Sequence, residues 1–374
     1  MIPVEPMRLA WLSNAPSADQ IDLLTALAAR PEIDLRVIYC SPQATKGEVL
    51  SSAPCGLGVF LNGSKLPGPS GGLFLNPSIV RLLTKSHYDV LIVSGYAHLT
   101  MQLAMLVRVI QRKPWLLFAE RSGMVENYSH AMARKLAMCM VRSAAGVIAT
   151  GRLAKQSFAS QLGSSRPLFS LPYLVNHDDF LRLPRPRKRD ATVNFMACGA
   201  LIPRKGFDVL IKAFQRAAVA KSDISLTIIG DGPERQALSE RVIEECRNRI
   251  RFLGEVKYAE RAEAFGEADV LVHPARHDGW GVVIHEALAA GLPVIATRET
   301  GAAYELVQDA NNGFLMDAED EDALVKHILW FANNQHEIQP FSDRARQAVT
   351  GLTPEWGAAE LVRITRSITS ANSR

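Results

Sequence analysis

Two acidic residues, Asp278 and Glu286, lie eight positions apart in a stretch whose residue types could bind hydroxyl groups. An apolar run over residues 268–274, short enough to be a buried strand, precedes them, and a glycine-bracketed turn over 278–281 follows that run. Glu286 falls in the first turns of the predicted helix after the turn. Because carboxylates accept hydrogen bonds from hydroxyl groups, the two acids indicate a hydroxyl-rich ligand such as a sugar.

The elements that must position these acids form one unit of strand, loop, helix and strand. Gly291 ends the helix, and Pro293 begins the next apolar strand, over 294–296. Units of this kind build open parallel sheets. In such sheets, ligands bind beyond the carboxyl ends of the strands, which is where both acids would lie.

A second loop, over residues 199–206, connects a predicted strand at 193–198 to a helix at 207–220. It contains the cation Lys205, next to the helix N-terminus, and together they predict a binding place for a diphosphate. The tight turn 230–233 follows the next strand. We also expect the helix that starts near Gly301 to have backbone amides available for phosphate.

These motifs resemble the signature of the large retaining glycosyltransferase family 4, which has the two-domain GT-B fold. In that family two Glu residues are separated by seven positions, with Gly-Phe-Gly after the first. This chain has Asp278 in place of the first Glu and Trp280 in place of Phe, whereas Glu286 matches the second Glu. Lys205 matches the Lys of the family's diphosphate loop. Ala200 replaces the usual Arg there.

The resemblance implies a role for each matched residue. Glu286 would hold the nucleotide ribose, Asp278 the donor sugar, and Lys205 the departing diphosphate, so these three are the predicted catalytic residues. Arg204 is the candidate replacement for the family arginine. The residues predicted to bind the donor are Arg204, Gly230, Gly232, Gly254, Gly279, Trp280, Gly281 and Gly301.

The first half of the chain carries the predicted acceptor side. Small residues follow a predicted strand at 88–93, and an acidic–basic pair follows another strand at 115–119. That pair fits an acceptor site and a local surface ion pair equally well. The candidate acceptor residues are Gly95, Tyr96, His98, Glu120 and Arg121.

The length of 374 residues suits two domains. The expected fold class is α/β, a GT-B fold with two doubly wound Rossmann-like domains that face a central cleft. We predict a first domain over 1–180, a linker over 181–191, a nucleotide-sugar domain over 192–345, and a C-terminal helix over 346–374 that crosses back to the first domain. Residues 41–78 are expected to form a long irregular insertion.

Charge is unevenly distributed. Residues 1–180 hold 17 Lys+Arg and 11 Asp+Glu, a net charge of +6, and residues 181–374 hold the remaining 25 and 27, a net charge of −2. The basic first half predicts an anionic lipid or phosphorylated saccharide as partner, and no motif predicts nucleic acid. A basic, Met- and Leu-rich helix predicted over 127–144 would lie on an anionic membrane or pack its apolar residues in the core.

The expected location is the cytoplasm, with peripheral attachment to the inner face of the plasma membrane. The five cysteines are odd in number and show no paired spacing, which is typical of free thiols in a reducing compartment. No apolar run approaches membrane-spanning length, and no His/Cys cluster predicts a metal site.

The expected reaction is transfer of a sugar, with retention of configuration, from a nucleotide diphosphate sugar to a saccharide or lipid-linked acceptor in cell-surface polysaccharide or lipopolysaccharide synthesis. A UDP-sugar is favoured over a GDP-sugar, and neither a metal nor another cofactor is expected. Two alternatives stay open: a nucleotide-sugar epimerase on the same fold, and a non-catalytic nucleotide-sugar-binding protein. Product formation without acceptor would favour the first, and donor binding without turnover would favour the second.

Overall fold

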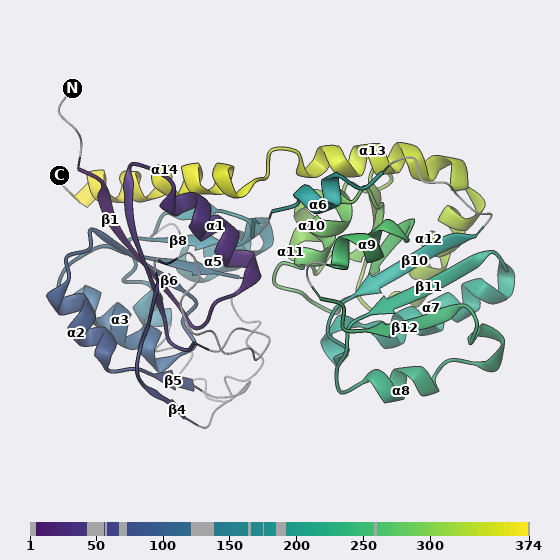
Figure 1. Ribbon diagram of the computed structural model, residues 1–374, viewed down its shortest axis with the longest axis horizontal. Coiled ribbons are helices and arrows are strands. Elements are labelled where there is room, and N and C mark those ends of the chain that lie inside the picture. The colour runs from purple at the N-terminus through teal and green to yellow at the C-terminus, as the bar shows by residue number, and fades with distance from the viewer. Residues whose placement is uncertain are drawn as a thin grey trace. The chain divides into compact units, whose positions relative to one another are not determined.

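The computed structural model describes residues 5–42, 56, 58–66, 73–120, 138–163, 166–174, 176–184, 192–257 and 260–372. The chain forms two compact units, one of Met1–Asn176 with Leu352–Arg374 and one of His177–Gly351 (Figure 1). The predicted boundaries at 180 and 346 differ from these by a few residues. Helix α13 (Ile338–Val349) packs against α10 (Val282–Ala289) of the second unit, so it does not belong to the crossing segment.

The first unit is a parallel seven-stranded sheet in the order β3-β2-β1-β6-β7-β8-β9. Side chains alternate between its faces, so Leu9 and Trp11 of β1 enter one core while Ala10 and Leu12 enter the other. Helices α1 and α14 cover one face, and α2, α3 and α5 cover the other (Figure 1). The strands are β1 (Met7–Ser13), β2 (Ile33–Tyr39), β3 (Gly58–Phe60), β6 (Val90–Ser94), β7 (Trp115–Ala119), β8 (Gly146–Ala149) and β9 (Leu168–Ser170), and the helices are α1 (Ala18–Ala28), α2 (Ser78–Lys85), α3 (Leu99–Ile110), α5 (Gly151–Leu162) and α14 (Pro354–Asn372).

The expectation of an irregular insertion over 41–78 is wrong for the part that the structure describes. Strand β3 extends the main sheet, and β4 (Ser64–Leu66) pairs with β5 (Leu73–Leu75) in a separate antiparallel sheet. Helix α2 begins at Ser78 and was not predicted. Three-residue strands are too short to show a hydrophobic period, because tertiary pairing rather than local pattern determines them.

The second unit is a parallel six-stranded sheet in the order β12-β11-β10-β13-β14-β15. Helices α7 and α12 pack together on one face, with Phe214 and Ile328 in their shared core. The strands are β10 (Val193–Cys198), β11 (Ile224–Ile229), β12 (Ile250–Gly254), β13 (Val270–His273), β14 (Val294–Thr297) and β15 (Gly313–Met316). The further helices are α6 (Asp178–Leu181), α7 (Phe207–Ala220), α8 (Arg235–Glu240), α9 (Arg261–Gly266), α11 (Gly301–Leu306) and α12 (Glu321–Asn333), with 3₁₀ turns at Pro203–Lys205, Glu244–Cys246 and Gln335–Glu337.

The strand order reverses between β10 and β13, so the chain leaves these two neighbouring strands in opposite directions. In doubly wound folds, ligands bind in a crevice at the carboxyl ends of two such strands. The same reversal occurs between β1 and β6 in the first unit. Within the described residues, no helix is long and apolar enough to cross a membrane.

Candidate active site

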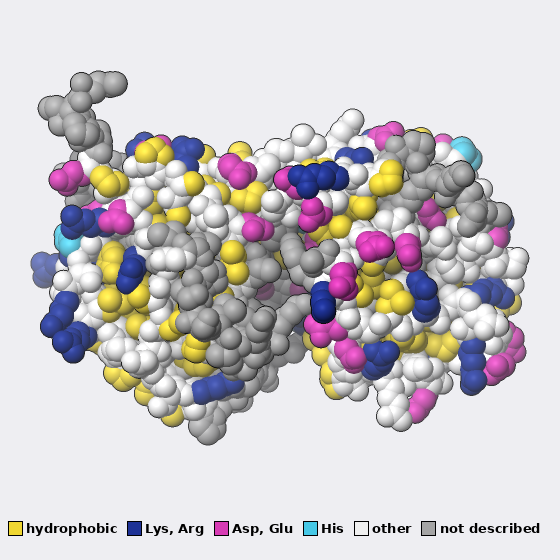
Figure 2. Space-filling view, viewed as in Figure 1, with side chains coloured by type: hydrophobic (Ala, Val, Ile, Leu, Met, Phe, Trp, Pro, Cys, Tyr) yellow, Lys and Arg dark blue, Asp and Glu magenta, His cyan; other side chains and the backbone are white. Residues whose placement is uncertain are grey.

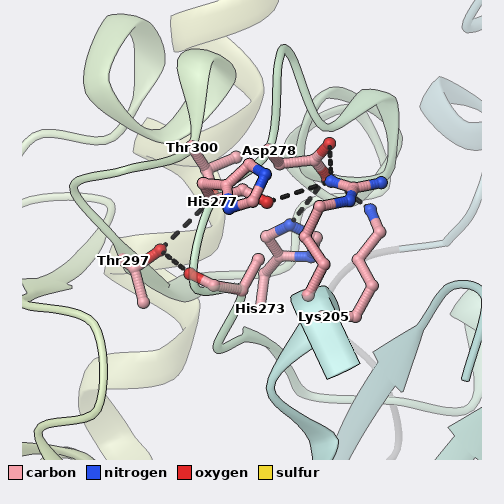
Figure 3. A network of polar contacts seen from close by, with 8 residues as sticks. Lys205, His273, His277, Asp278, Thr297 and Thr300 are labelled. Atoms are coloured by element: carbon pink, nitrogen blue, oxygen red, sulfur yellow. Dashed lines mark hydrogen bonds and ion pairs between the residues drawn. The ribbon is translucent and has the colours of Figure 1, made fainter. Parts of the chain in front are cut away.

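The loops after β10 and β13 bring four polar side chains together at the crevice of the second unit (Figure 3). Arg204 Nη1 donates to Asp278 Oδ1 at 3.0 Å, and Lys205 Nζ forms an ion pair with Asp278 Oδ2. His273 Nε2 lies 3.2 Å from the same Oδ2. The structure therefore brings together Lys205, Arg204 and Asp278, three residues that the sequence predicted for one site.

Tight backbone packing brings these two loops into contact. Gly206 has φ +68°, and a Cβ there would clash with the carbonyl oxygen of Pro274 in the loop after β13. Gly281 has φ +85°, and a Cβ there would clash with the Thr300 side chain. Only glycine tolerates both the positive φ and the close approach, so Gly206 holds the loop of Lys205 against the loop after β13, and Gly281 holds the loop of Asp278 against Thr300.

The ion cluster fixes the charge of each member. Burial by itself would raise the pKa of Asp278, but the hydrogen bond with His273 and the positive charge of Lys205 outweigh it and hold that pKa far below its usual range. The pKa of His273 is lowered, chiefly by burial, although its hydrogen bond to Asp278 opposes the shift. Two cations thus face one carboxylate and a neutral imidazole. The net positive charge suits a ligand that carries several negative charges, such as a diphosphate.

Glu286 lies on α10, and its side chain is fully buried. Its Oε1 accepts a hydrogen bond from Arg261 Nη1 of α9 at 2.8 Å, and Arg261 Nη2 lies 3.5 Å from the Cys198 sulfur at the end of β10. Neither Arg261 nor His273 was predicted from the sequence. His273 could have been found, since it is a polar residue that ends an apolar strand five positions before Asp278. No local pattern marks Arg261, because its contact depends on where α9 packs.

The structure corrects two expectations for the donor loops. The Trp280 side chain is buried, with 1% exposure, and packs its ring near His285, so it fills the core instead of offering a binding surface. The amides of Gly301 and Ala302 donate to the carbonyl groups of Asp278 and Trp280, at 3.2 and 2.7 Å. These two amides at the start of α11 are therefore not available for phosphate, because the loop over 278–280 pairs with the helix start.

The remaining predicted donor glycines also lie at the carboxyl edge of this sheet. The Gly230 amide donates to the Gly254 carbonyl at 2.7 Å, which joins the turns after β11 and β12. The Gly232 amide donates to Asp231 Oδ1 within the same turn. Gly279 lies in the loop that pairs with α11, and its carbonyl leaves no room for a Cβ on Gly301. Each of these glycines thus serves backbone packing around the crevice.

The first unit has a pocket of about 300 Å³ at its own reversal point, between the ends of β1 and β6. Gln20 Nε2 donates to Ser94 Oγ at 3.0 Å at its wall. His98 Nδ1 accepts the Phe74 amide at 3.3 Å, and burial followed by the charge of Lys65 lowers the pKa of His98, so the ring is neutral. Four of the predicted acceptor residues line this pocket, namely Gly95, Tyr96, His98 and Glu120. Arg121 lies outside the described residues.

Comparison with known proteins follows the same division of the chain. Residues 184–348 match the family described as Glycosyl transferases group 1. A phosphatidyl-myo-inositol mannosyltransferase of Mycobacterium leprae is 30% identical over 236 residues, which are 61% of each chain. An uncharacterized glycosyltransferase of Methanocaldococcus jannaschii is 34% identical over 149 residues, which are 40% of this chain and 41% of the relative. The chain thus spans about two fifths to three fifths of the length of these relatives.

Solved structures match nearly the whole chain. HepE of Anabaena in complex with UDP superposes with a TM-score of 0.73 at 17% identity, covering 97% of this chain and 100% of HepE. Sucrose-phosphate synthase of Thermosynechococcus elongatus gives a TM-score of 0.74 at 20% identity, covering 98% and 100%. The chain therefore has the GT-B fold, which confirms the predicted fold class.

The match over residues 184–348 supports the class of protein that the sequence predicted, a group 1 glycosyltransferase. The ion cluster of Lys205, Arg204 and Asp278 and the buried Glu286 all lie within this range.

Proposed function

We propose that this protein is a retaining glycosyltransferase that moves a sugar from a nucleotide diphosphate sugar to a hydroxyl group of a saccharide or lipid-linked acceptor. The observation that carries the proposal is the cluster of Lys205, Arg204 and Asp278 at the β10–β13 crevice of a group 1 domain. It offers cations for a diphosphate and a carboxylate for sugar hydroxyls in one place. Its side chains are largely buried, so little water screens their charges.

In this proposal each group acts on one part of the donor. Lys205 and Arg204 bind the diphosphate and stabilise the negative charge that develops as its bond to the sugar breaks. Asp278, held in its anionic form, accepts hydrogen bonds from the donor sugar. Glu286, one of whose oxygens is held by Arg261, accepts from the ribose. The acceptor hydroxyl attacks from the face that the diphosphate leaves, and its proton passes to the departing diphosphate oxygen.

Donor and acceptor are proposed from the relatives and the pockets together. UDP is bound in the solved structure of HepE, whereas a relative from Corynebacterium glutamicum is named as GDP-mannose-dependent and acts on a phosphatidylinositol mannoside. We place a UDP-sugar first and a GDP-sugar second. A lipid-linked or saccharide acceptor would enter the pocket lined by Tyr96 and His98. The reaction would serve cell-surface polysaccharide or lipopolysaccharide synthesis at the inner face of the plasma membrane.

The test is calorimetry with UDP and GDP in the presence of a metal chelator. One of the two should bind, and Lys205→Met should weaken binding roughly 10-fold or more, because a charged hydrogen bond is worth about 1.5–3 kcal/mol. Lys212→Met is the matched control, since Lys212 is an exposed lysine of α7 in the same unit. Binding that requires Mg²⁺ or Mn²⁺, or an unchanged affinity in Lys205→Met, would contradict the proposal.

Turnover separates the alternatives. With donor and a panel of saccharide and lipid-linked acceptors, we expect a glycoside product with the anomeric configuration of the donor. Conversion of the donor sugar without acceptor would identify an epimerase. Donor binding with no product from any acceptor would identify a binding protein.

A further inference from the structure

Helices α2 and α3 of the first unit expose large apolar side chains on neighbouring surfaces. They pack side by side on one face of the sheet, and Gln111 Nε2, just after α3, donates to the Leu83 carbonyl of α2 at 3.0 Å. Ten large apolar side chains are exposed within the described residues, and four of them lie on these two helices: Val80, Leu106, Val109 and Ile110. Leu106, Val109 and Ile110 lie in the last two turns of α3, and Ile110 is 73% exposed, so the apolar surface is concentrated near the end of α3.

Cations accompany these apolar side chains. Arg81 and Lys85 are exposed on α2, and Arg112 and Lys113 directly follow α3. Figure 2 shows Lys and Arg side chains over α2, at the left of the first unit. We define the α2–α3 face as these four cations together with the four apolar residues: Val80, Arg81, Lys85, Leu106, Val109, Ile110, Arg112 and Lys113.

The stretch that contains this face accounts for most of the charge of the first half. Residues 49–119 hold six Lys+Arg and one acidic residue, Asp89, a net charge of +5 out of the +6 for residues 1–180. Asp89 already accepts the Arg8 amide at 2.8 Å and pairs with His87 at 3.3 Å. The charge of the α2–α3 face is therefore complementary to an anionic surface.

Backbone strain at Arg112 is a second observation. Lys113 N donates to the Arg108 carbonyl and Arg112 N to the Val109 carbonyl, which is the pattern of a Schellman helix end. The residue at the position of Arg112 adopts a left-handed conformation, here with φ +54°, and glycine is usual there. A strained non-glycine residue points to a use for its side chain. This position carries a cation two residues after Ile110.

We propose that the α2–α3 face docks the first unit on the surface of an anionic lipid bilayer. The apolar side chains enter the boundary between headgroups and acyl chains, and the four cations pair with lipid phosphates. Two helices that present apolar and basic side chains and contain no acidic residue of their own favour a lipid surface over a protein partner. The proposal deepens the proposed function, because it names the surface through which a lipid-linked acceptor is reached. It replaces the predicted helix over 127–144, most of which lies outside the described residues.

The test is co-sedimentation of the full chain with vesicles of phosphatidylcholine, with and without phosphatidylglycerol. We expect binding only to the anionic vesicles, decreasing as salt screens the charges. Each cation removed should lower the partition coefficient about fivefold. Arg81→Ser with Lys85→Ser should thus lower it roughly 25-fold, and Ile110→Ser should lower it because apolar insertion is lost.

Arg112→Gly separates docking from folding. Glycine relieves the strain, so the melting temperature should stay the same or rise while vesicle binding falls about fivefold. Two controls match the variants. Arg152→Ser with Lys155→Ser removes exposed cations from α5 of the same unit, and Val219→Ser removes an apolar side chain of α7 that is 77% exposed. Both controls should bind vesicles as the wild type does.

Equal binding to neutral and anionic vesicles would overturn the proposal, and so would controls that lose as much binding as the α2–α3 variants. Unchanged vesicle binding in Arg112→Gly would also overturn it. If the variants instead abolish self-association or binding to another protein without any lipid binding, the face belongs to a protein partner. Nucleotide affinity should be unchanged in all of these variants, so a failure here is distinct from a failure of the proposed transferase activity.

Discussion

Replacing Asp278 by Asn should lower the stability of the second unit and, at the same time, raise its affinity for a nucleoside diphosphate. Asn keeps the volume of the side chain but removes the charge that Arg204 and Lys205 share. In the absence of ligand, the two cations then face each other without a counter-ion. A diphosphate would supply the missing negative charge.

The magnitudes follow from the geometry of the cluster. At 3.0 Å and an effective dielectric constant of about 20, the Arg204–Asp278 attraction is about 5.5 kcal/mol before desolvation is subtracted. Removing one partner of a buried pair costs about 3–5 kcal/mol, and the 30% exposure of Arg204 favours the lower end, about 3 kcal/mol. If the released cations form one more charged hydrogen bond to the diphosphate, affinity rises roughly 10-fold or more. Turnover should fall by roughly 10- to 100-fold, because the donor sugar loses a charged acceptor.

Calorimetry with UDP or GDP measures the affinity, and thermal unfolding with and without the nucleotide measures the stability. The increase in melting temperature on nucleotide addition should be larger for Asp278→Asn than for the wild type. Asp278→Glu keeps the charge, so its nucleotide affinity should match the wild type and its turnover should be partly retained. Asp208→Asn is a matched control, because Asp208 pairs with Arg276 at 2.9 Å in the same unit; it should lose stability without gaining nucleotide affinity.

A folded Asp278→Asn protein that binds the nucleoside diphosphate more weakly than the wild type would refute this reasoning, because Asp278 and the diphosphate would then not share the same cations. Acid provides a second check. The pKa of Asp278 is lower in the folded protein than its ordinary value of 3.8, so its stabilisation is complete above that value and is lost as the pH falls below it. The stability difference between wild type and Asp278→Asn should therefore shrink below about pH 4.

Two further predictions concern side chains in the second unit. Arg261→Leu should weaken nucleoside diphosphate binding roughly 10-fold in calorimetry, because Glu286 loses the charged hydrogen bond that orients it. Arg261→Lys should recover part of the lost affinity. Wild-type affinity in Arg261→Leu would show that Arg261 does not have this role. His177 is buried, and burial lowers its pKa from 6.5 to about 4. Between these two values the unfolded chain binds a proton that the folded chain does not bind. The free energy of unfolding therefore decreases as the pH falls through this range, by about 2 kcal/mol at about pH 5. Urea unfolding at neutral and mildly acidic pH should show a smaller loss for His177→Leu than for the wild type, and an equal loss would assign the effect to other groups.

The site was predictable from the sequence where short motifs determine local geometry. In the sequence, Gly206 directly follows Lys205, and Gly281 lies three positions after Asp278. The loops that present Lys205 and Asp278 could therefore be placed at strand ends before the contact between these two side chains was known. The topology then brings the two loops together, because β10 and β13 are neighbours on which the strand order reverses. The strand over 193–198 and the helix over 207–220 were predicted with the ends that the structure shows, because each is an apolar segment of the length typical of its kind. The short helices α8 and α9 of the same unit were not predicted.

What could not be predicted depends on tertiary packing. The ion pair between Arg261 and Glu286 requires α9 to lie against α10, and nothing in the residues around position 261 indicates that. The hydrogen bond from the Gly301 amide to the Asp278 carbonyl depends on a pairing between two loops, and no hydrophobic period in the sequence indicates such a pairing. Helix α2 (Ser78–Lys85) was missed because its eight residues are fewer than the window of about 11–18 in which a helical period can be recognised.

In the first unit, the described lining of the pocket and the α2–α3 face differ in charge. The pocket between β1 and β6 is lined by Tyr96, Phe118, Tyr173 and Glu120 together with neutral polar groups, and no Lys or Arg is among its described lining residues. Aromatic rings and a carboxylate suit an uncharged sugar better than a phosphate, because rings stack on sugar faces and a carboxylate repels phosphate. Four cations of this half lie on the α2–α3 face instead. These four cations favour the proposed docking on an anionic surface, and the described lining of the pocket favours an uncharged sugar there.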